Sequence, residues 1–170
     1  MRTFILLSAV PGAGKSTWAE QYRLSNKNVK VVSSDALRKE ITGEYQNFKH
    51  EAEVWEKYFS LINDYAKNSE DVTVIADSTN LTNKYRKKYI EKVKGFDFKI
   101  LIVLKKDLKT LLKQNRQRSE SQIVPEYVLK NMYKSFEDPS KEIIDFFDEY
   151  MVIYKWFDSS RVKDSFHYQK

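Results

Sequence analysis

The sequence predicts an α/β fold in which a five-stranded parallel sheet has helices on both faces. Five short apolar runs alternate with segments of helical periodicity along 170 residues. Each run is continuously apolar rather than alternating, which is typical of strands buried on both faces of a parallel sheet. A chain of this length can bury one substantial core, so we expect a single domain. The five runs are 3–10, 29–33, 72–77, 98–104 and 150–156.

The first run leads directly into a segment with the pattern of a phosphate-binding loop. In such a loop, backbone N–H groups and the positive end of the next helix converge on one polyphosphate. Gly12 and Gly14 let the main chain approach the phosphates, and Lys15 reaches the β and γ oxygens. The Ser16 hydroxyl can ligate Mg²⁺. Phosphate contacts are expected from Pro11, Gly12, Ala13, Gly14, Lys15, Ser16 and Thr17.

One position departs from the pattern G-x-x-x-x-G-K-[ST]. Ala9 stands where the first glycine is expected. We therefore predict that this position needs a small side chain but not a positive φ angle. The alternative for the whole segment is a glycine-rich turn that opens an ordinary helix. The strand before it and the Lys-Ser-Thr sequence that closes it favour the phosphate loop.

A candidate general base follows the second run, in the sequence Ser-Ser-Asp-Ala-Leu-Arg over 33–38. Ligands of open α/β sheets bind at the carboxyl ends of the strands, so these residues are expected to face the phosphates. Asp35 can accept a proton from a hydroxyl, and Arg38, on the same helical face, can bind an acceptor phosphate. The alternative is that Ser34 or Asp35 only caps a helix over 36–41.

A second acidic candidate, Asp77, closes the third run and is followed by Ser-Thr-Asn. An aspartate in this position resembles a Walker B carboxylate, which would hold Mg²⁺ directly or through water. Asp35 fits the general base better because an arginine accompanies it. Asp77 fits a role in metal binding or in the acceptor loop better.

Helical patterns fill the segments between the runs. Asp107 is expected to cap the helix that follows it, and Pro125 to be the first residue of another, which ends at 138–139. A last helix is predicted over 141–147. Aromatic residues of the two earlier helices are expected in the core rather than on a ligand. The apolar positions of those helices are Val54, Tyr58, Leu61, Ile62 and Tyr65, then Tyr85, Tyr89, Ile90 and Val93.

The segment 114–122 is polar, bears arginines and is flexible in composition. Arg116 and Arg118 have the character of lid arginines, which close over a transferring phosphoryl group and neutralise its charge. The alternative is that both serve only surface solubility. The sequence becomes polar after residue 157, so we predict one domain over 1–157 and a polar tail over 158–170.

Composition narrows the classes of protein further. The chain has no cysteine, which excludes disulfides and thiolate metal sites and makes the reducing cytoplasm the expected compartment. It shows no signal pattern and no apolar run near the ~20 residues of a membrane span, so no membrane partner is expected. The net charge is +6, but 84–118 alone holds 13 basic residues against three acidic ones. Such a region suits a nucleic acid, although a solvated lysine-rich helix face is the alternative.

Four motifs in this order resemble the kinase domain of phage-type polynucleotide 5′-hydroxyl kinases. The resemblance runs from residue 1 to about 137. It implies a P-loop kinase fold with an arginine-bearing lid, and transfer of the ATP γ-phosphate to the 5′-OH end of DNA or RNA in end repair. The motifs are Pro-Gly-Ala-Gly-Lys-Ser-Thr-Trp at 11–18, Ser-Asp-Ala-Leu-Arg at 34–38, Asp-Ser-Thr-Asn-Leu at 77–81 and Asn-Arg-Gln-Arg at 115–118, the last followed by Val-Pro and Met-Tyr-Lys-Ser-Phe.

The resemblance also implies roles for single residues. Lys15 and Ser16 would hold the phosphates and Mg²⁺, while Asp35 would be the general base. Arg38 would grip the phosphate next to the acceptor nucleoside. The expected catalytic residues are thus Lys15, Asp35 and Arg118. Arg116 is expected to bind the nucleotide and Ser16 the metal. The residues expected to bind the substrate are Arg38, Asp77, Thr79 and Asn80.

Two features depart from the family pattern. Some members carry Ser-Asp-Thr-Asn where this chain has Asp77-Ser78-Thr79-Asn80. The chain also has no D-x-D-G-T phosphatase signature. We therefore expect a kinase-only chain, for which a phosphatase or a ligase would be a separate partner.

Two other functions stay open. Related P-loop kinases of similar size act on small hydroxyl compounds, such as sugar acids or antibiotics, or on aminoacyl-tRNA, and salt dependence separates small from polymeric acceptors. A nucleotide-dependent switch is the alternative of a different class, but a switch has no need of Asp35 and Arg38 on the acceptor side. Trp55, Phe59 and the connection 43–50 either line an acceptor channel or belong to the core.

Overall fold

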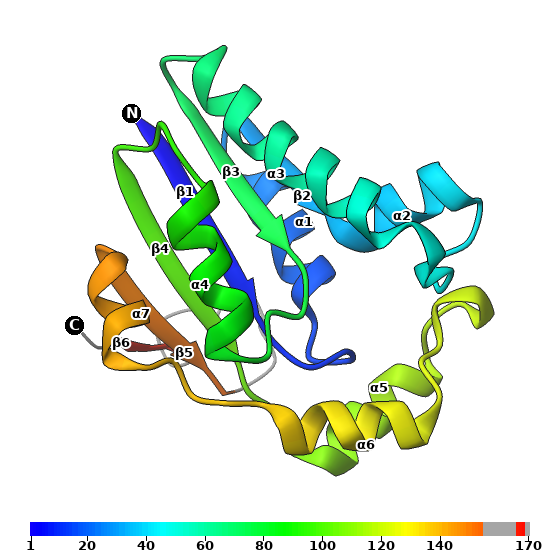
Figure 1. The fold of residues 1–170 in the computed structure, drawn as a ribbon. Coiled ribbons are helices and arrows are strands. Elements are labelled where there is room, and N and C mark those ends of the chain that lie inside the picture. The colour runs from blue at the N-terminus through cyan, green and yellow to red at the C-terminus, as the bar shows by residue number, and fades with distance from the viewer. Residues whose placement is uncertain (155–165, 169–170) are drawn as a thin grey trace.

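A computed structural model describes residues 1–154 and 166–168. Its six strands form one sheet in the order β2-β3-β1-β4-β5-β6, and the first five are parallel (Figure 1). The predicted five-stranded parallel sheet is therefore confirmed. The strands are β1 (Arg2–Ser8), β2 (Val29–Ser33), β3 (Val72–Asp77), β4 (Phe98–Leu104), β5 (Glu149–Ile153) and β6 (Phe166–Tyr168).

The strand bounds follow the apolar runs closely, with differences in β1 and β5. Strands β2, β3 and β4 have the predicted bounds, whereas β1 ends at Ser8 because the chain turns there into the phosphate loop. The predicted end of the fifth strand, 155–156, lies outside the described residues. The polar segment predicted as a tail contributes β6, which pairs antiparallel with β5.

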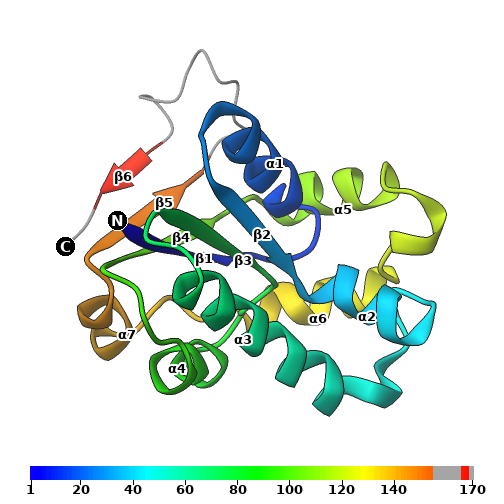
Figure 2. The same cartoon turned by 90° about the horizontal axis from the view of Figure 1, so that it is seen from above.

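Helices cover both faces of the sheet (Figure 2). Helices α1 (Lys15–Ser25) and α5 (Leu108–Arg116) lie on one face, and α3 (Glu51–Lys67), α4 (Asn83–Lys92) and α7 (Lys141–Phe146) lie on the other. At the carboxyl ends of the strands lie α2 (Ser34–Thr42) and α6 (Glu126–Ser135), with the short helices η1 (Phe48–His50) and η2 (Glu120–Gln122). No helix of the described residues is long and apolar enough to cross a membrane.

Each face of the sheet has its own hydrophobic core. Side chains of β1 alternate between them, since Phe4 and Leu6 pack toward α3 and α4 while Ile5 and Leu7 pack toward α1 and α5. Tyr58 and Tyr89 are buried, as predicted. The same prediction is wrong for Tyr85, which is 51% exposed, whereas the next residue of the same turn, Arg86, is buried.

The ends of the helices test the capping predictions. Asp107 caps α5 as expected, since its Oδ1 accepts from Thr110 N at 2.7 Å. Pro125 is the N-cap of α6 rather than its first residue, and the helix ends at Ser135, before the predicted 138–139. Ser33, rather than Ser34 or Asp35, caps α2 by accepting from Ala36 N. Asp35 therefore lies in the first turn of α2.

A buried arginine connects the loop after β3 to the sheet. Arg86 on α4 is fully buried and donates to Ser8 Oγ at the end of β1, to Leu81 O, and to Glu137 O at 2.6 Å. Burial lowers the pKa of its guanidinium from its ordinary value to about 10. The side chain thereby connects β1, the loop after β3 and the segment that follows α6.

Replacing this arginine by an apolar residue of similar length tests that connection. Arg86→Met leaves the carbonyls of Leu81 and Glu137 without their donor, so we expect the free energy of unfolding to fall by about 2–4 kcal/mol. Urea denaturation measures the change. The exposed neighbour provides the control, because Lys84→Met should change stability by less than about 0.5 kcal/mol. Equal stability of the two variants would contradict the connection.

Candidate active site

A large cleft opens at the carboxyl ends of β1, β2 and β3. Its volume is about 1270 Å³, which exceeds the roughly 300–1,000 Å³ of typical small-ligand pockets. The phosphate loop, the start of α2, the loop after β3, the predicted lid segment 114–122 and α6 all contribute to its lining. A cleft of this size has room for two substrates at once.

The phosphate loop takes its shape from its glycines. Gly12 and Gly14 have φ angles of 91° and 95°, and Gly14 is the N-cap of α1. A Cβ atom on Gly12 would lie 2.7 Å from Leu111 O of α5, so the loop packs directly against this helix. Among the described non-glycine residues only Asn28 and Asn80 have positive φ. The prediction that Ala9 is small but needs no positive φ is therefore confirmed, and Ala9 N donates to Thr79 O at 2.9 Å.

Opposite charges meet at the floor of the cleft. Ser16 Oγ donates to Asp77 Oδ2 at 2.9 Å, and Lys15 Nζ donates to Ala9 O at 3.2 Å. Burial lowers the pKa of Lys15 and raises the pKa of Asp77, and the attraction between the two charges opposes both shifts. The positive charge of Arg118 also acts on both groups.

The Ser16 and Asp77 oxygens suit a magnesium ion. Mg²⁺ in phosphate-transfer sites is held by one or two protein oxygens together with substrate phosphates. A hydroxyl and a carboxylate oxygen 2.9 Å apart beside the phosphate loop provide such a pair. This contact favours a metal role for Asp77 over a role in the acceptor loop.

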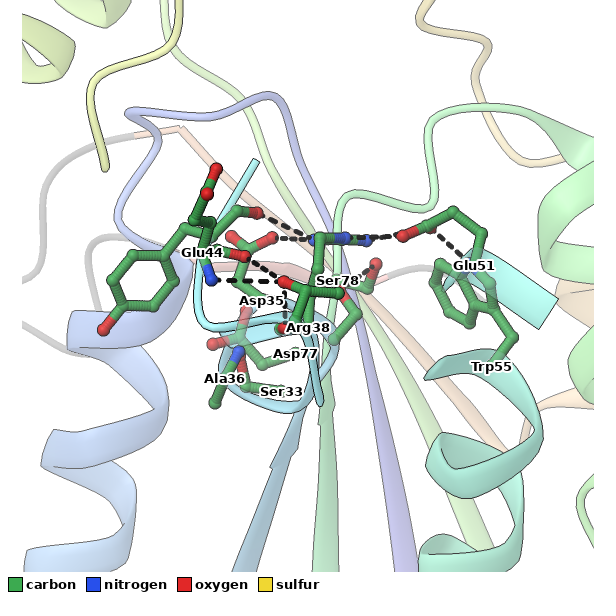
Figure 3. A network of polar contacts seen from close by, with 12 residues as sticks. Ser33, Asp35, Ala36, Arg38, Glu44, Glu51, Trp55, Asp77 and Ser78 are labelled. Atoms are coloured by element: carbon green, nitrogen blue, oxygen red, sulfur yellow. Dashed lines mark hydrogen bonds and ion pairs between the residues drawn. The ribbon is translucent and has the colours of Figure 1, made fainter. Parts of the chain in front are cut away.

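Asp35 and Arg38 lie side by side in a network that extends to α3 (Figure 3). Arg38 Nη1 donates to Asp35 Oδ1 at 2.6 Å, and Nε and Nη2 donate to the two carboxylate oxygens of Glu51 at 2.6 and 3.0 Å. Trp55 Nε1 donates to Glu51 Oε2 at 3.0 Å. The Arg38 side chain is 5% exposed, whereas that of Asp35 is 56% exposed. Arg38 is therefore held in place, and Asp35 is presented to the cleft.

Glu51 is the partner of Arg38 that the sequence did not indicate. It lies thirteen residues further along the chain, at the start of a different helix, so no spacing rule joins the two. Acidic residues in a first helical turn are common, and Glu51 was indistinguishable from Glu53 by that criterion. Of the two aromatic residues left open, Phe59 belongs to the core, whereas Trp55 both packs against the core and lines the cleft.

Thr79 and Asn80 both reach the cleft, but Asn80 is engaged inside the protein. Its Nδ2 donates to Leu7 O at 2.8 Å and to Ser78 O at 3.2 Å, and its Oδ1 accepts from Tyr89 OH at 2.7 Å. The side chain is buried. Asn80 therefore anchors the loop after β3, and Thr79 is the more accessible candidate for contact with an acceptor.

The lid separates the two predicted arginines. Arg118 lines the cleft, whereas Arg116 Nε binds Glu126 Oε1 at 3.1 Å, away from the cleft lining. The buried Asn115 bonds Val124 through both its Nδ2 and its Oδ1, so it fixes the two ends of the lid loop. Gln46 Nε2 donates to Ile123 O at 2.7 Å, which links the lid to the loop before α3.

Comparison with known families identifies the family to which the chain belongs. A family model described as an AAA domain (AAA_33) matches residues 5–139, and the chain belongs to that family. The L-seryl-tRNA(Sec) kinase of Methanococcus maripaludis is 29% identical over 143 residues, covering 79% of this chain. The chain spans about half the length of this relative, 52%. The chain has the fold and the phosphate loop of P-loop kinases, a class that binds ATP through this loop.

Solved structures share the fold at low sequence identity. A chain of the Pnkp1/Rnl/Hen1 RNA repair complex matches with a TM-score of 0.69 at 17% identity, covering 79% of this chain and 43% of that one. A gluconokinase from Sinorhizobium meliloti 1021 matches with a TM-score of 0.58 at 18% identity, covering 94% and 86%. The P-loop kinase fold is therefore shared by proteins that are named for different acceptors.

The contact between the phosphate loop and α5 makes a testable prediction. Gly43→Ala places a Cβ in open space at φ 86°. We therefore expect the free energy of unfolding to fall by only about 1–2 kcal/mol, the cost of a left-handed conformation for a residue with a side chain. Gly12→Ala adds the clash with Leu111 O and should cost about 3 kcal/mol or more and abolish ATP binding. Urea denaturation and ATP titration measure both effects. Equal costs at the two glycines would show that the loop does not depend on this contact.

The bond between Glu51 and Arg38 predicts a pH-dependent contribution to stability. Glu51→Gln removes the carboxylate from a nearly buried guanidinium and should lower the free energy of unfolding by about 1–3 kcal/mol at pH 7. Burial alone would raise the Glu51 pKa, but the hydrogen bonds and charge of Arg38 lower it below 4.5.

Because the folded pKa is the lower one, the carboxylate contributes fully above about pH 4.5 and loses its contribution as the pH falls through the folded pKa. The difference between wild type and Glu51→Gln should therefore shrink in acid. Denaturation at several pH values measures it, with Glu53→Gln on the same helix as the control. A difference that does not change with pH would rule out the ion pair as its source.

Proposed function

We propose that this chain is an ATP-dependent polynucleotide 5′-hydroxyl kinase that transfers the γ-phosphate to the 5′-OH end of DNA or RNA. The observation that carries the proposal is the exposed Asp35 carboxylate, held by Arg38 at the same cleft as the phosphate loop. A kinase needs a base for the acceptor hydroxyl at this position, whereas a nucleotide switch does not.

The reaction is an in-line displacement at the γ-phosphorus. Asp35 accepts the proton of the 5′-OH as the acceptor oxygen bonds to phosphorus, and the bond to the β,γ-bridging oxygen breaks to release ADP. Lys15 and Arg118 stabilise the charge on the γ oxygens. Ser16 and Asp77 would hold Mg²⁺, which supplies further charge neutralisation. Arg38 orients Asp35.

The charge distribution supports a polymeric acceptor. The basic window over 84–118 begins on α4, whose first turn adjoins the cleft through Thr82 and Tyr85. Neutralisation of phosphates by lysine and arginine is the sequence-independent part of nucleic-acid affinity. The fold match to a chain of an RNA repair complex is consistent with end repair, in which a separate phosphatase or ligase would act on the same ends.

A second candidate is transfer to a small hydroxyl compound or to an aminoacyl group on tRNA. The 29% identity to an L-seryl-tRNA(Sec) kinase and the fold shared with a gluconokinase favour it. The catalytic groups would act in the same way, and only the acceptor would differ.

The test is γ-phosphate transfer from labelled ATP with Mg²⁺ to four acceptors in parallel. They are a 5′-OH DNA, a 5′-OH RNA, seryl-tRNA and gluconate. We expect label on the nucleic-acid 5′ ends and a fall in kcat of about 10²–10⁴-fold in Asp35→Asn, because a general base contributes that much. ATP affinity should stay unchanged.

Asp64→Asn, an exposed aspartate on α3, is the matched control and should keep wild-type activity. Label that appears only on seryl-tRNA or gluconate would replace the proposed function by the second candidate. Transfer to a 5′ end that is unaffected in Asp35→Asn would exclude Asp35 as the base.

A further inference from the structure

Three of the most exposed aromatic side chains in the described part of the chain line the cleft. They are Phe48 at 60%, Tyr85 at 51% and Tyr127 at 70% exposure. They come from three separate segments, η1, α4 and α6. Exposed apolar rings that gather at a cleft mark a surface that binds a partner.

These rings surround the acceptor side of the cleft. The centre of the Phe48 ring lies 4.6 Å from the guanidinium carbon of Arg38, the partner of the proposed base. Tyr85 follows the loop that carries Thr79 at the end of β3. Tyr127 belongs to a row on α6 that continues one turn apart through Asn131 and Ser135, and all three line the cleft.

Positive charge accompanies the rings. Lys88 Nζ lies 5.2 Å from the centre of the Tyr85 ring, and Lys84 is exposed next to it. Lys130 is exposed one turn from Tyr127. Within the described residues, none of these three lysines forms an ion pair with a carboxylate. Aromatic rings beside unpaired lysines are what single-stranded nucleic acid requires, since bases stack on the rings and phosphates bind the cations.

We infer that Tyr85 and Tyr127 form a stacking platform for the bases that follow the 5′-terminal nucleotide of a single-stranded acceptor. The inference rests on the proposed function and adds to it the part of the acceptor that the platform binds. In this inference the rings act through affinity for the strand and not on the reacting groups. A small acceptor, or one that ends at its first nucleotide, does not reach them.

The test compares two acceptors that share the 5′-OH but differ in length. One is a nucleoside 3′-monophosphate, and the other is a single-stranded 5′-OH oligonucleotide of about eight nucleotides, a typical site size for single strands. In the double variant Tyr85→Ala, Tyr127→Ala we expect KM for the oligonucleotide to rise about 10-fold or more, since each stacked base contributes strongly to affinity. KM for the monophosphate, KM for ATP and kcat should not change.

Two further variants separate stacking from other effects. Tyr85→Phe with Tyr127→Phe keeps the rings and should restore the wild-type KM. Tyr133→Ala removes a ring that is 41% exposed on the same helix α6 but does not line the cleft, and it should behave as wild type. Equal KM changes for both acceptors would overturn the platform. A change in KM for ATP would also overturn it, because the rings would then bind the base of ATP.

A binding measurement separates this inference from the proposed function. The same oligonucleotide is given a fluorescent label, and its equilibrium binding is followed by anisotropy. Wild-type binding that the alanine variant weakens, without any phosphate transfer, would keep the platform and overturn the kinase proposal. Transfer that the variant leaves unchanged would keep the kinase and overturn the platform. Absence of both binding and transfer would overturn both.

Discussion

The junction between the ends of β1 and β3 is the constraint on which the site depends. Ala9 N bonds Thr79 O, Ser8 Oγ bonds Asn80 O, and the Asn80 amide bonds Leu7 O. Asn80 has a φ of 49°, a left-handed conformation that asparagine tolerates better than most residues. Because these bonds fix the start of the phosphate loop against the loop after β3, Ser16 and Asp77 meet at one point. The two sides of the cleft are thus aligned by hydrogen bonds within the protein itself.

The charges of the site form two groups with different environments. Lys15 and Asp77 lie at the floor, where burial disfavours both ionised forms and their mutual attraction opposes this effect, together with the hydrogen bond from Ser16 to Asp77. A bound phosphate would place negative charge beside Lys15, and a bound metal ion would place positive charge beside Asp77. The binding of both would therefore be favoured. Asp35 instead stays exposed beside Arg38. Glu51 binds Arg38 and is itself bound by Trp55, so the arginine is held rigidly. A rigid support with an accessible carboxylate is the arrangement that a general base requires.

Local signals in the sequence predicted much of this structure, and contacts between distant segments explain what was missed. The continuous apolar runs predicted β2, β3 and β4 to the residue, and the phosphate loop carries its own pattern. Glu51 was missed because its bond to Arg38 joins two helices that only tertiary packing brings together. Helical periodicity put Tyr85 in the core, yet in the first turn of α4 it is the next residue, Arg86, that is buried, and Tyr85 is 51% exposed. The three-residue β6 lies in a polar stretch without periodicity.

The identity of the acceptor depends on the elements outside the sheet. The strands and the phosphate loop provide Lys15, Ser16 and Asp77, a set that serves phosphate transfer to any hydroxyl. The opposite wall is built by α3, α4, α6 and the 43–50 connection. A pocket for a small polar acceptor encloses it with hydrogen-bonding groups. This wall instead presents exposed rings to the cleft, and exposed lysines lie beside two of them. In the proposed function, the rings and the lysines would give a flexible strand surfaces for its bases and its phosphates.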